Sequence, residues 1–76
     1  MINVTMPSLA EGIDKASISY WYHKIGDNIK EGEDLVELVT DKATFNMPSP
    51  VTGTLKTIIV EEGCDAKVGE TIAIIE

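Results

Sequence analysis

The sequence predicts a small all-β domain, a flattened barrel or sandwich of two four-stranded antiparallel sheets with pseudo-twofold symmetry. Apolar and polar residues alternate with a period of two, and no segment of ten or more residues carries an apolar stripe at helical spacing. The second half also repeats the first after 37 residues, which aligns Gly26 with Gly63, Lys30 with Lys67, Gly32 with Gly69 and Glu33 with Glu70. Two copies of one small β-unit therefore account for the chain.

Eight strands are expected, at residues 2–6, 16–22, 28–30, 35–41, 43–47, 53–60, 65–67 and 71–76. Glycines mark the turns on either side of the two shortest strands, 28–30 and 65–67. Trp21 is expected in or against the core, and Tyr20 and Tyr22 are interpreted as strand filling rather than as a platform for a ligand. Alternation directs these side chains inward: Ile2, Val4, Met6, Val36, Leu38, Ala43, Phe45, Met47, Ile72 and Ile74.

The repeat also places one lysine in a distinctive position. Two copies need one connection, and strands 35–41 and 43–47 flank that connection with Asp41 and Lys42 as the central turn residues. Asp followed by a long polar side chain suits a type I turn and not the glycine-rich primed turns. The equivalent of this turn in the second copy falls beyond residue 76, so we expect the termini at the opposite end from Lys42.

Composition excludes several functions. The 76 residues form one domain of formal net charge −7, with 13 acidic residues against 6 lysines and no arginine. Such a chain is a poor ligand for nucleic acid and for anionic lipid. It has no apolar run long enough to span a membrane, and no secretory signal is visible. One cysteine, Cys64, excludes an internal disulfide and favours a reducing compartment.

No catalytic constellation is evident from the sequence. His23 has no partner at a persuasive spacing and is interpreted as a surface strand residue, while Cys64 is interpreted as a structural thiol. A protonated lysine is a weak nucleophile, and Asp41 beside Lys42 favours the charged form. Lys42 is therefore expected to accept an activated acyl group from another enzyme rather than to catalyse a reaction itself.

The surroundings of Lys42 resemble a known attachment segment. Residues 37–53, ELVTDKATFNMPSPVTG, resemble the lipoyl-attachment segment of 2-oxo acid dehydrogenase complexes, and residues 6–12, MPSLAEG, resemble the opening of the same domains. Residues 29–35 and 68–72 fit at the two repeat-related positions. The resemblance covers essentially the whole chain. It implies the barrel-sandwich hybrid fold, with the attachment lysine at a hairpin tip.

The resemblance implies that Lys42 is N6-lipoylated by a lipoate ligase or lipoyl transferase. The lipoyl arm would accept an acyl group and electrons from a thiamine-diphosphate-dependent 2-oxo acid decarboxylase. It would pass the acyl group to coenzyme A at an acyltransferase core and be reoxidised by dihydrolipoamide dehydrogenase. The domain itself would be a non-catalytic carrier.

The resemblance also implies recognition residues around the attachment site. Asp41 and Ala43 would be read by partner enzymes together with the loop from Pro7 to Lys15, of which the residues of interest are Ser8, Leu9, Ala10, Glu11 and Gly12. Val39 departs from the pattern, because many relatives carry Glu or Gln there. We expect Val39 to face outward and to make this rim more apolar.

Two other carriers share the architecture. Biotin carriers usually flank the lysine with methionine, whereas Lys42 has Asp41 and Ala43 as neighbours. Glycine-cleavage carriers are longer and contain helical sequence that has no counterpart here. We expect residues 1–76 to be a monomeric lipoyl-carrier domain excised from the N-terminus of a longer dihydrolipoamide acyltransferase. Its expected location is the bacterial cytoplasm, or the mitochondrial matrix in a eukaryote.

Overall fold

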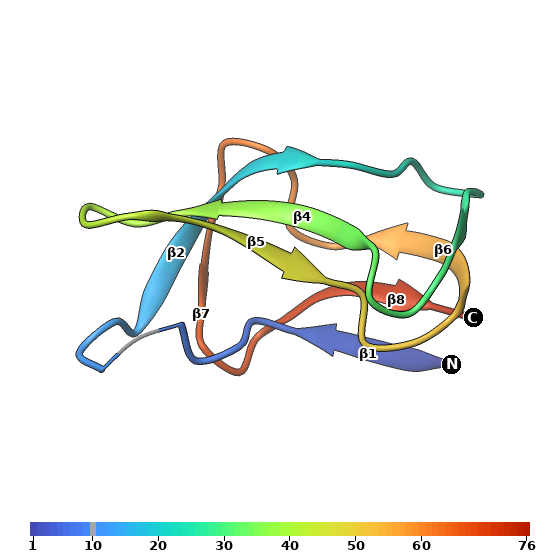
Figure 1. The fold of residues 1–76 in the computed structure, drawn as a ribbon, viewed down its shortest axis with the longest axis horizontal. Helices are drawn as coiled ribbons and strands as arrows, with labels where there is room; N and C mark the ends of the chain where they lie inside the picture. Colours follow the sequence, from blue (N-terminus) through green and yellow to red (C-terminus); the bar gives the residue numbers. More distant parts are fainter. Residues whose placement is uncertain (10) are drawn as a thin grey trace.

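A computed structural model describes residues 1–9 and 11–76, and these residues form eight strands and no helix (Figure 1). The predicted strands are confirmed, with ends that differ by two residues at most. The strands are β1 (Ile2–Thr5), β2 (Lys15–Trp21), β3 (Asn28–Ile29), β4 (Asp34–Val39), β5 (Thr44–Pro48), β6 (Gly53–Ile58), β7 (Asp65–Lys67) and β8 (Thr71–Ile75).

The strands form two antiparallel sheets of four, in the orders β1-β8-β6-β3 and β5-β4-β2-β7. A shift of 37 residues carries β2, β3 and β4 onto β6, β7 and β8, and β1 takes the place in its sheet that β5 takes in the other. Each sheet therefore draws strands from both halves, since β3 pairs with β6 and β7 pairs with β2. The predicted pseudo-twofold sandwich is confirmed.

The residues that the repeat conserves between its halves form the same turn contacts twice. Gly26 N–H donates to the carbonyl of Leu55 at 2.7 Å, and Gly63 N–H donates to that of Ile18 at 2.8 Å. Gly26 and Gly63 have φ angles of 97° and 88°, which glycine adopts with little strain. Each glutamate accepts from the backbone N–H three residues earlier, Glu33 from Lys30 at 2.6 Å and Glu70 from Lys67 at 2.9 Å.

A β-bulge in each half changes the expected alternation of buried residues. In β4 the pairing steps from Asp34 to Val36, so Leu35 and Val36 are both fully buried. Ile72 and Ala73 in β8 repeat this arrangement, because the pairing with β1 steps from Ala73 to Thr71. The core consists of Val4, Met6, Ala16, Ile18, Trp21, Ile29, Leu35, Val36, Leu38, Leu55, Ala66, Ile72, Ala73 and Ile75.

Three of the expected core positions were wrong. Ile74 is only half-buried, because the bulge shifts the inward position to Ile75. Ile2 is 46% exposed because it starts an edge strand near the chain ends, and Ala43 is exposed because it lies beyond the last core pair of the hairpin. Phe45 and Met47 are half-buried and pack on the core as expected.

The β4–β5 turn and the chain termini lie at opposite ends of the molecule. The Cα trace measures 32 × 20 × 17 Å, and the β4–β5 turn lies at one end of the longest axis with both termini at the other (Figure 1). The loop between β1 and β2 lies at the same end as the turn. That end is therefore free of the chain termini, as the repeat predicted. No helix in residues 1–9 and 11–76 has the length and apolar character needed to cross a membrane.

Replacing Gly53 by alanine is expected to destabilise the domain by about 1–3 kcal/mol, because the new methyl group would crowd the C-terminal end of β8. A Cβ there would lie 2.5 Å from the carbonyl oxygen of Glu76 and 2.7 Å from Cγ2 of Ile75. Urea unfolding measures the change, with Ser8→Ala at an exposed loop position as the control. Equal stability of Gly53→Ala and the wild type would contradict this close approach.

Candidate functional site

Lys42 occupies a two-residue turn that closes the β4–β5 hairpin. Strand pairing runs to Val39 opposite Thr44, and Thr40 N–H then donates to the carbonyl of Ala43 at 2.8 Å. Asp41 and Lys42 are therefore the central turn residues, as predicted, although β4 ends at Val39 and not at Asp41. Only glycines have positive φ among the described residues, which excludes the primed turns and agrees with the expected type I geometry.

The hydroxyl of Thr40 organises the turn, a role that was not predicted from the sequence. Thr40 Oγ1 accepts from the N–H groups of Lys42 and Ala43 at 3.2 and 3.1 Å, and it donates to the carbonyl of Ala43 at 3.1 Å. A threonine that begins a turn and bonds the backbone two or three residues on is a known local motif, so the signal was present. The backbone of an exposed tip is thereby restrained.

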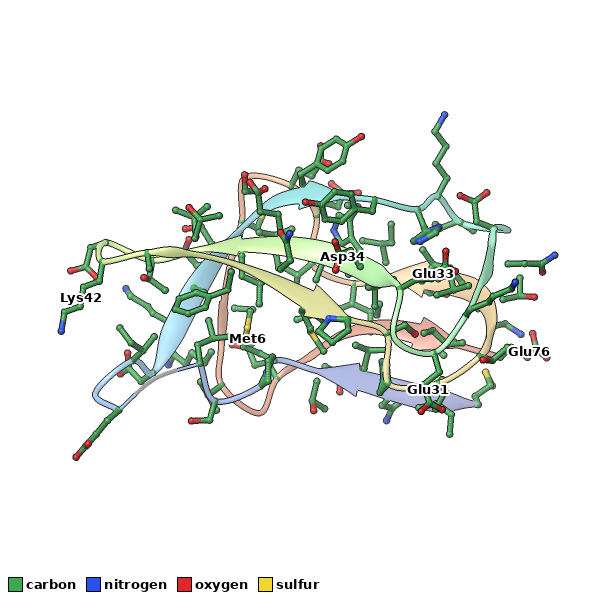
Figure 2. The ribbon with its side chains drawn as sticks, in the orientation of Figure 1. Met6, Glu31, Glu33, Asp34, Lys42 and Glu76 are labelled. Atoms are coloured by element: carbon green, nitrogen blue, oxygen red, sulfur yellow. The ribbon has the colours of Figure 1, made fainter. Side chains whose placement is uncertain are left out.

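The Lys42 side chain is exposed and extends away from the body of the domain (Figure 2). Within the described part of the chain, Lys56 forms an ion pair with Glu76 at 3.2 Å, and His23 Nδ1 lies 3.9 Å from Asp27 Oδ2. Neither contact involves Lys42. Asp41 and Ala43 are exposed as well. An enzyme can therefore approach the Lys42 amine and both of its sequence neighbours from solvent.

Only part of the predicted recognition loop shares a hollow with the turn. A hollow of about 590 Å³ lies between them and is lined by residues 12–17, residues 39–41 and Asp65, so Gly12 and Asp41 share one site. Ser8 and Glu11 are exposed but do not line it, and Ala10 lies outside the described residues. Leu9 is half-buried against the core, so part of its side chain supports the fold.

Val39 is half-buried and not fully outward. It contributes an apolar wall to this hollow, beside the polar side chains of Asp14, Ser17 and Asp65. Ser17 donates to Asp65 Oδ1 at 2.5 Å, which links β2 to β7 at the floor of the site.

A hydrogen-bonded group of side chains covers the outer face of the same sheet. Ser19 Oγ donates to Glu37 Oε1 at 3.0 Å, and Tyr22 OH donates to Asn46 Oδ1 at 3.0 Å and lies 3.4 Å from Glu37 Oε2. Desolvation and the carboxylates of Glu37 and Asp34 raise the pKa of the Tyr22 phenol. The Tyr20 ring meets the Tyr22 ring edge-on at 5.1 Å.

The other residues considered as candidates, Trp21, His23 and Cys64, lie outside the turn that carries Lys42. Trp21 is buried, as expected, and its indole N–H donates to the carbonyl of Val60 at 3.0 Å. His23 is half-buried and lies after β2 rather than within a strand, and Cys64 is an exposed free thiol. Residues 1–9 and 11–76 contain no group of three or more His, Cys, Asp or Glu placed to hold a metal.

A duplicated all-β domain with an exposed lysine on the turn that joins its halves belongs to the class of cofactor-carrier domains. Residues 2–75 match the Biotin_lipoyl family, described as "Biotin-requiring enzyme". The chain belongs to this family of biotin- and lipoyl-attachment domains, and the domain is a carrier and not itself an enzyme.

Similar proteins include acyltransferase components and a solved lipoyl domain. The chain is 42% identical over 71 residues, 93% of its length, to the dihydrolipoyllysine-residue acetyltransferase component of pyruvate dehydrogenase complex of Staphylococcus aureus. The corresponding component of Staphylococcus epidermidis is 41% identical over the same length. The chain spans 16% of each of these relatives.

The lipoyl domain of the 2-oxoglutarate dehydrogenase complex from Azotobacter vinelandii superposes with a TM-score of 0.79. The two are 25% identical, and the match covers 100% of this chain and 96% of that one. The likeness therefore extends over the whole fold and includes the β4–β5 hairpin.

Thr40→Val is expected to lower stability by about 1 kcal/mol, because two turn N–H groups lose their acceptor. Amide hydrogen exchange at Lys42 and Ala43 should become faster while exchange in the core strands stays slow. Thr40→Ser retains the hydroxyl and should preserve protection. Unchanged exchange in Thr40→Val would contradict the role assigned to this side chain.

Proposed function

We propose that this domain carries lipoate in amide linkage on Lys42 and serves as the mobile acyl carrier of a 2-oxo acid dehydrogenase complex. The single observation that supports this most strongly is the place of Lys42, exposed at the tip of a restrained turn that joins the two halves of the barrel. Family membership and the relatives named above support the same function.

The residues present fit such an attachment. The Lys42 side chain is exposed, and its backbone is held by Thr40. A modifying enzyme supplies the carboxyl group of the cofactor in activated form. The deprotonated Lys42 amine attacks the carboxyl carbon, a C–N bond forms, the activating group leaves and the nitrogen loses a proton. Once attached, the dithiolane supplies acyl transfer coupled to two-electron redox chemistry.

The chain's own residues position the arm and leave it unobstructed. Strands β4 and β5 are paired as far as Val39 and Thr44, so Lys42 stands on a rigid base. A carrier that is confined to a complex meets each catalytic site at a high effective concentration, which is the advantage of attachment to such a base. Asp41 and Ala43, being exposed, are placed for recognition by the enzymes that act on the arm.

Lipoate is proposed over biotin because of the residues beside Lys42. Biotin carriers usually have methionine on both sides, whereas Asp41 and Ala43 stand here. The relatives whose names refer to dihydrolipoyllysine support the same choice.

The proposed partners follow from the same function. They are a lipoate ligase or lipoyl transferase, a thiamine-diphosphate-dependent decarboxylase, the acyltransferase core of the parent chain and dihydrolipoamide dehydrogenase. The domain is proposed to act as a monomeric unit of a longer acyltransferase, in the bacterial cytoplasm or in the mitochondrial matrix.

Lys42→Arg is expected to keep the fold and abolish modification, because a guanidinium cannot form the amide. The domain is produced with lipoate and, separately, with biotin, and intact mass and peptide mapping report the attached group. Lys67→Arg serves as the control and should be modified as the wild type is. Biotin on the wild type, or any attached cofactor on Lys42→Arg, would refute the assignment.

Exchange of residues 8–14 for an unrelated loop of equal length is expected to leave lipoylation of Lys42 intact and to reduce reductive acylation by the decarboxylase. The reason is that this loop lies at the end of the domain that carries the turn (Figure 1). Circular dichroism checks the fold. In a folded variant, unchanged reductive acylation or an equal loss of both reactions would contradict a role of this loop in recognition by the decarboxylase.

A further inference from the structure

The twofold repeat provides an internal comparison between the outer faces of the two sheets. We define the tyrosine face as Ser19, Tyr20, Tyr22, Glu37 and Asn46, which lie on or directly after β2, β4 and β5. The 37-residue shift gives as counterparts of the first four Lys56, Thr57, Ile59 and Ile74. Asn3 takes the place of Asn46, because Asn3 pairs with Ile74 as Asn46 pairs with Glu37.

The backbones of the two faces correspond, and their side chains do not. Each has a bulge at the same place, since the pairing of β2 steps from Ile18 to Tyr20 and that of β6 steps from Leu55 to Thr57. The tyrosine face is linked across three strands by the Ser19–Glu37 and Tyr22–Asn46 hydrogen bonds. Among the described residues, the five counterparts make no side-chain hydrogen bonds with one another. The backbone arrangement that the two faces share therefore does not by itself dictate this network.

The composition of the tyrosine face suits a protein partner. Tyr20 and Tyr22 are 52% and 38% exposed, and tyrosine is enriched where proteins associate. Their mutual contact and the hydrogen bonds hold the side chains in place before binding, which lowers the entropy lost on association.

The face is continuous with the attachment site and has a definite charge. Glu37 lies on β4 five residues before Lys42, and their Cα atoms are less than about 16 Å apart, because β4 ends at Val39 and the turn shortens the rest of the path. Asp34 lies at the far end of β4 (Figure 2). Apart from Lys42, every charged residue from 34 to 48 is acidic, namely Asp34, Glu37 and Asp41. A basic surface is the complement of this hairpin.

We propose that the enzyme that couples the cofactor to Lys42 docks on the tyrosine face and presents an arginine or lysine to Glu37. This inference rests on the proposed function. The coupling enzyme meets the domain before any arm is attached, so its active site must reach the Lys42 amine itself. A standard interface covers about 800 Å² of one partner, a patch about 16 Å in radius. Centred on the turn, such a patch extends to Glu37.

The test uses the unmodified domain, a lipoate ligase and free lipoate, with intact mass as the readout across domain concentrations. Tyr20→Ser and Glu37→Gln are each expected to raise KM about tenfold with little change in kcat. Glu37→Lys should raise KM further. Added salt should raise the KM of the wild type by a larger factor than that of Glu37→Gln, because the variant lacks the charge that salt screens. Ile59→Ser is the control, because Ile59 lies on the corresponding face of the other sheet and, at 49% exposed, matches the exposure of Tyr20.

Wild-type KM in both Tyr20→Ser and Glu37→Gln would overturn the docking surface, and so would an equal loss in Ile59→Ser. Thermal unfolding is measured for each variant. If Tyr20→Ser is unstable, the KM of Glu37→Gln alone tests the docking surface, because glutamine preserves the volume of the side chain. Variants lipoylated to completion should be reductively acylated as the wild type is, and an equal loss there would overturn the choice of the coupling enzyme. A wild-type domain that takes up no lipoate would instead overturn the proposed function itself.

Discussion

The fold depends on the exchange of strands between its two halves. The short strand β3 of the first half pairs only with β6, and β7 of the second half pairs with β2. Reciprocal bonds from Gly26 to Leu55 and from Gly63 to Ile18 close this exchange. Because neither half can complete a sheet alone, the core becomes buried only when strands of the two halves pair. The connection between the halves must then lie at one end of the barrel, which is where Lys42 is found.

This constraint explains why an exposed tip can be well positioned. The hairpin that carries Lys42 is paired on one side with β2, and the buried side chains of Val36 and Leu38 anchor it in the core. Thr40 extends that order into the turn. The mobility that the proposed swinging arm needs is thus confined to the Lys42 side chain, while the backbone of the turn stays in place.

Most of the architecture could be predicted because strand alternation, turn glycines and the internal repeat are all local or periodic signals. The inward positions failed where they depend on pairing: the bulges at Leu35 and Ile72 reset the alternation, and only the partner strand reveals them. The place of Lys42 followed from the repeat, whereas the bond from Tyr22 to Asn46 joins residues 24 apart and depends on strand register. The turn bonds of Thr40 were local and could have been anticipated.

The most direct test of this account moves the lysine by one residue without changing composition or charge. The double variant Asp41→Lys/Lys42→Asp keeps the hairpin but changes the direction in which the amine leaves the turn. The modified site is measured by intact mass and peptide mapping after incubation with lipoate and a lipoate ligase. The double variant is expected to fold and to take up no lipoate at position 41. Attachment there at the wild-type rate would contradict it, because the geometry of the turn would then be irrelevant to recognition.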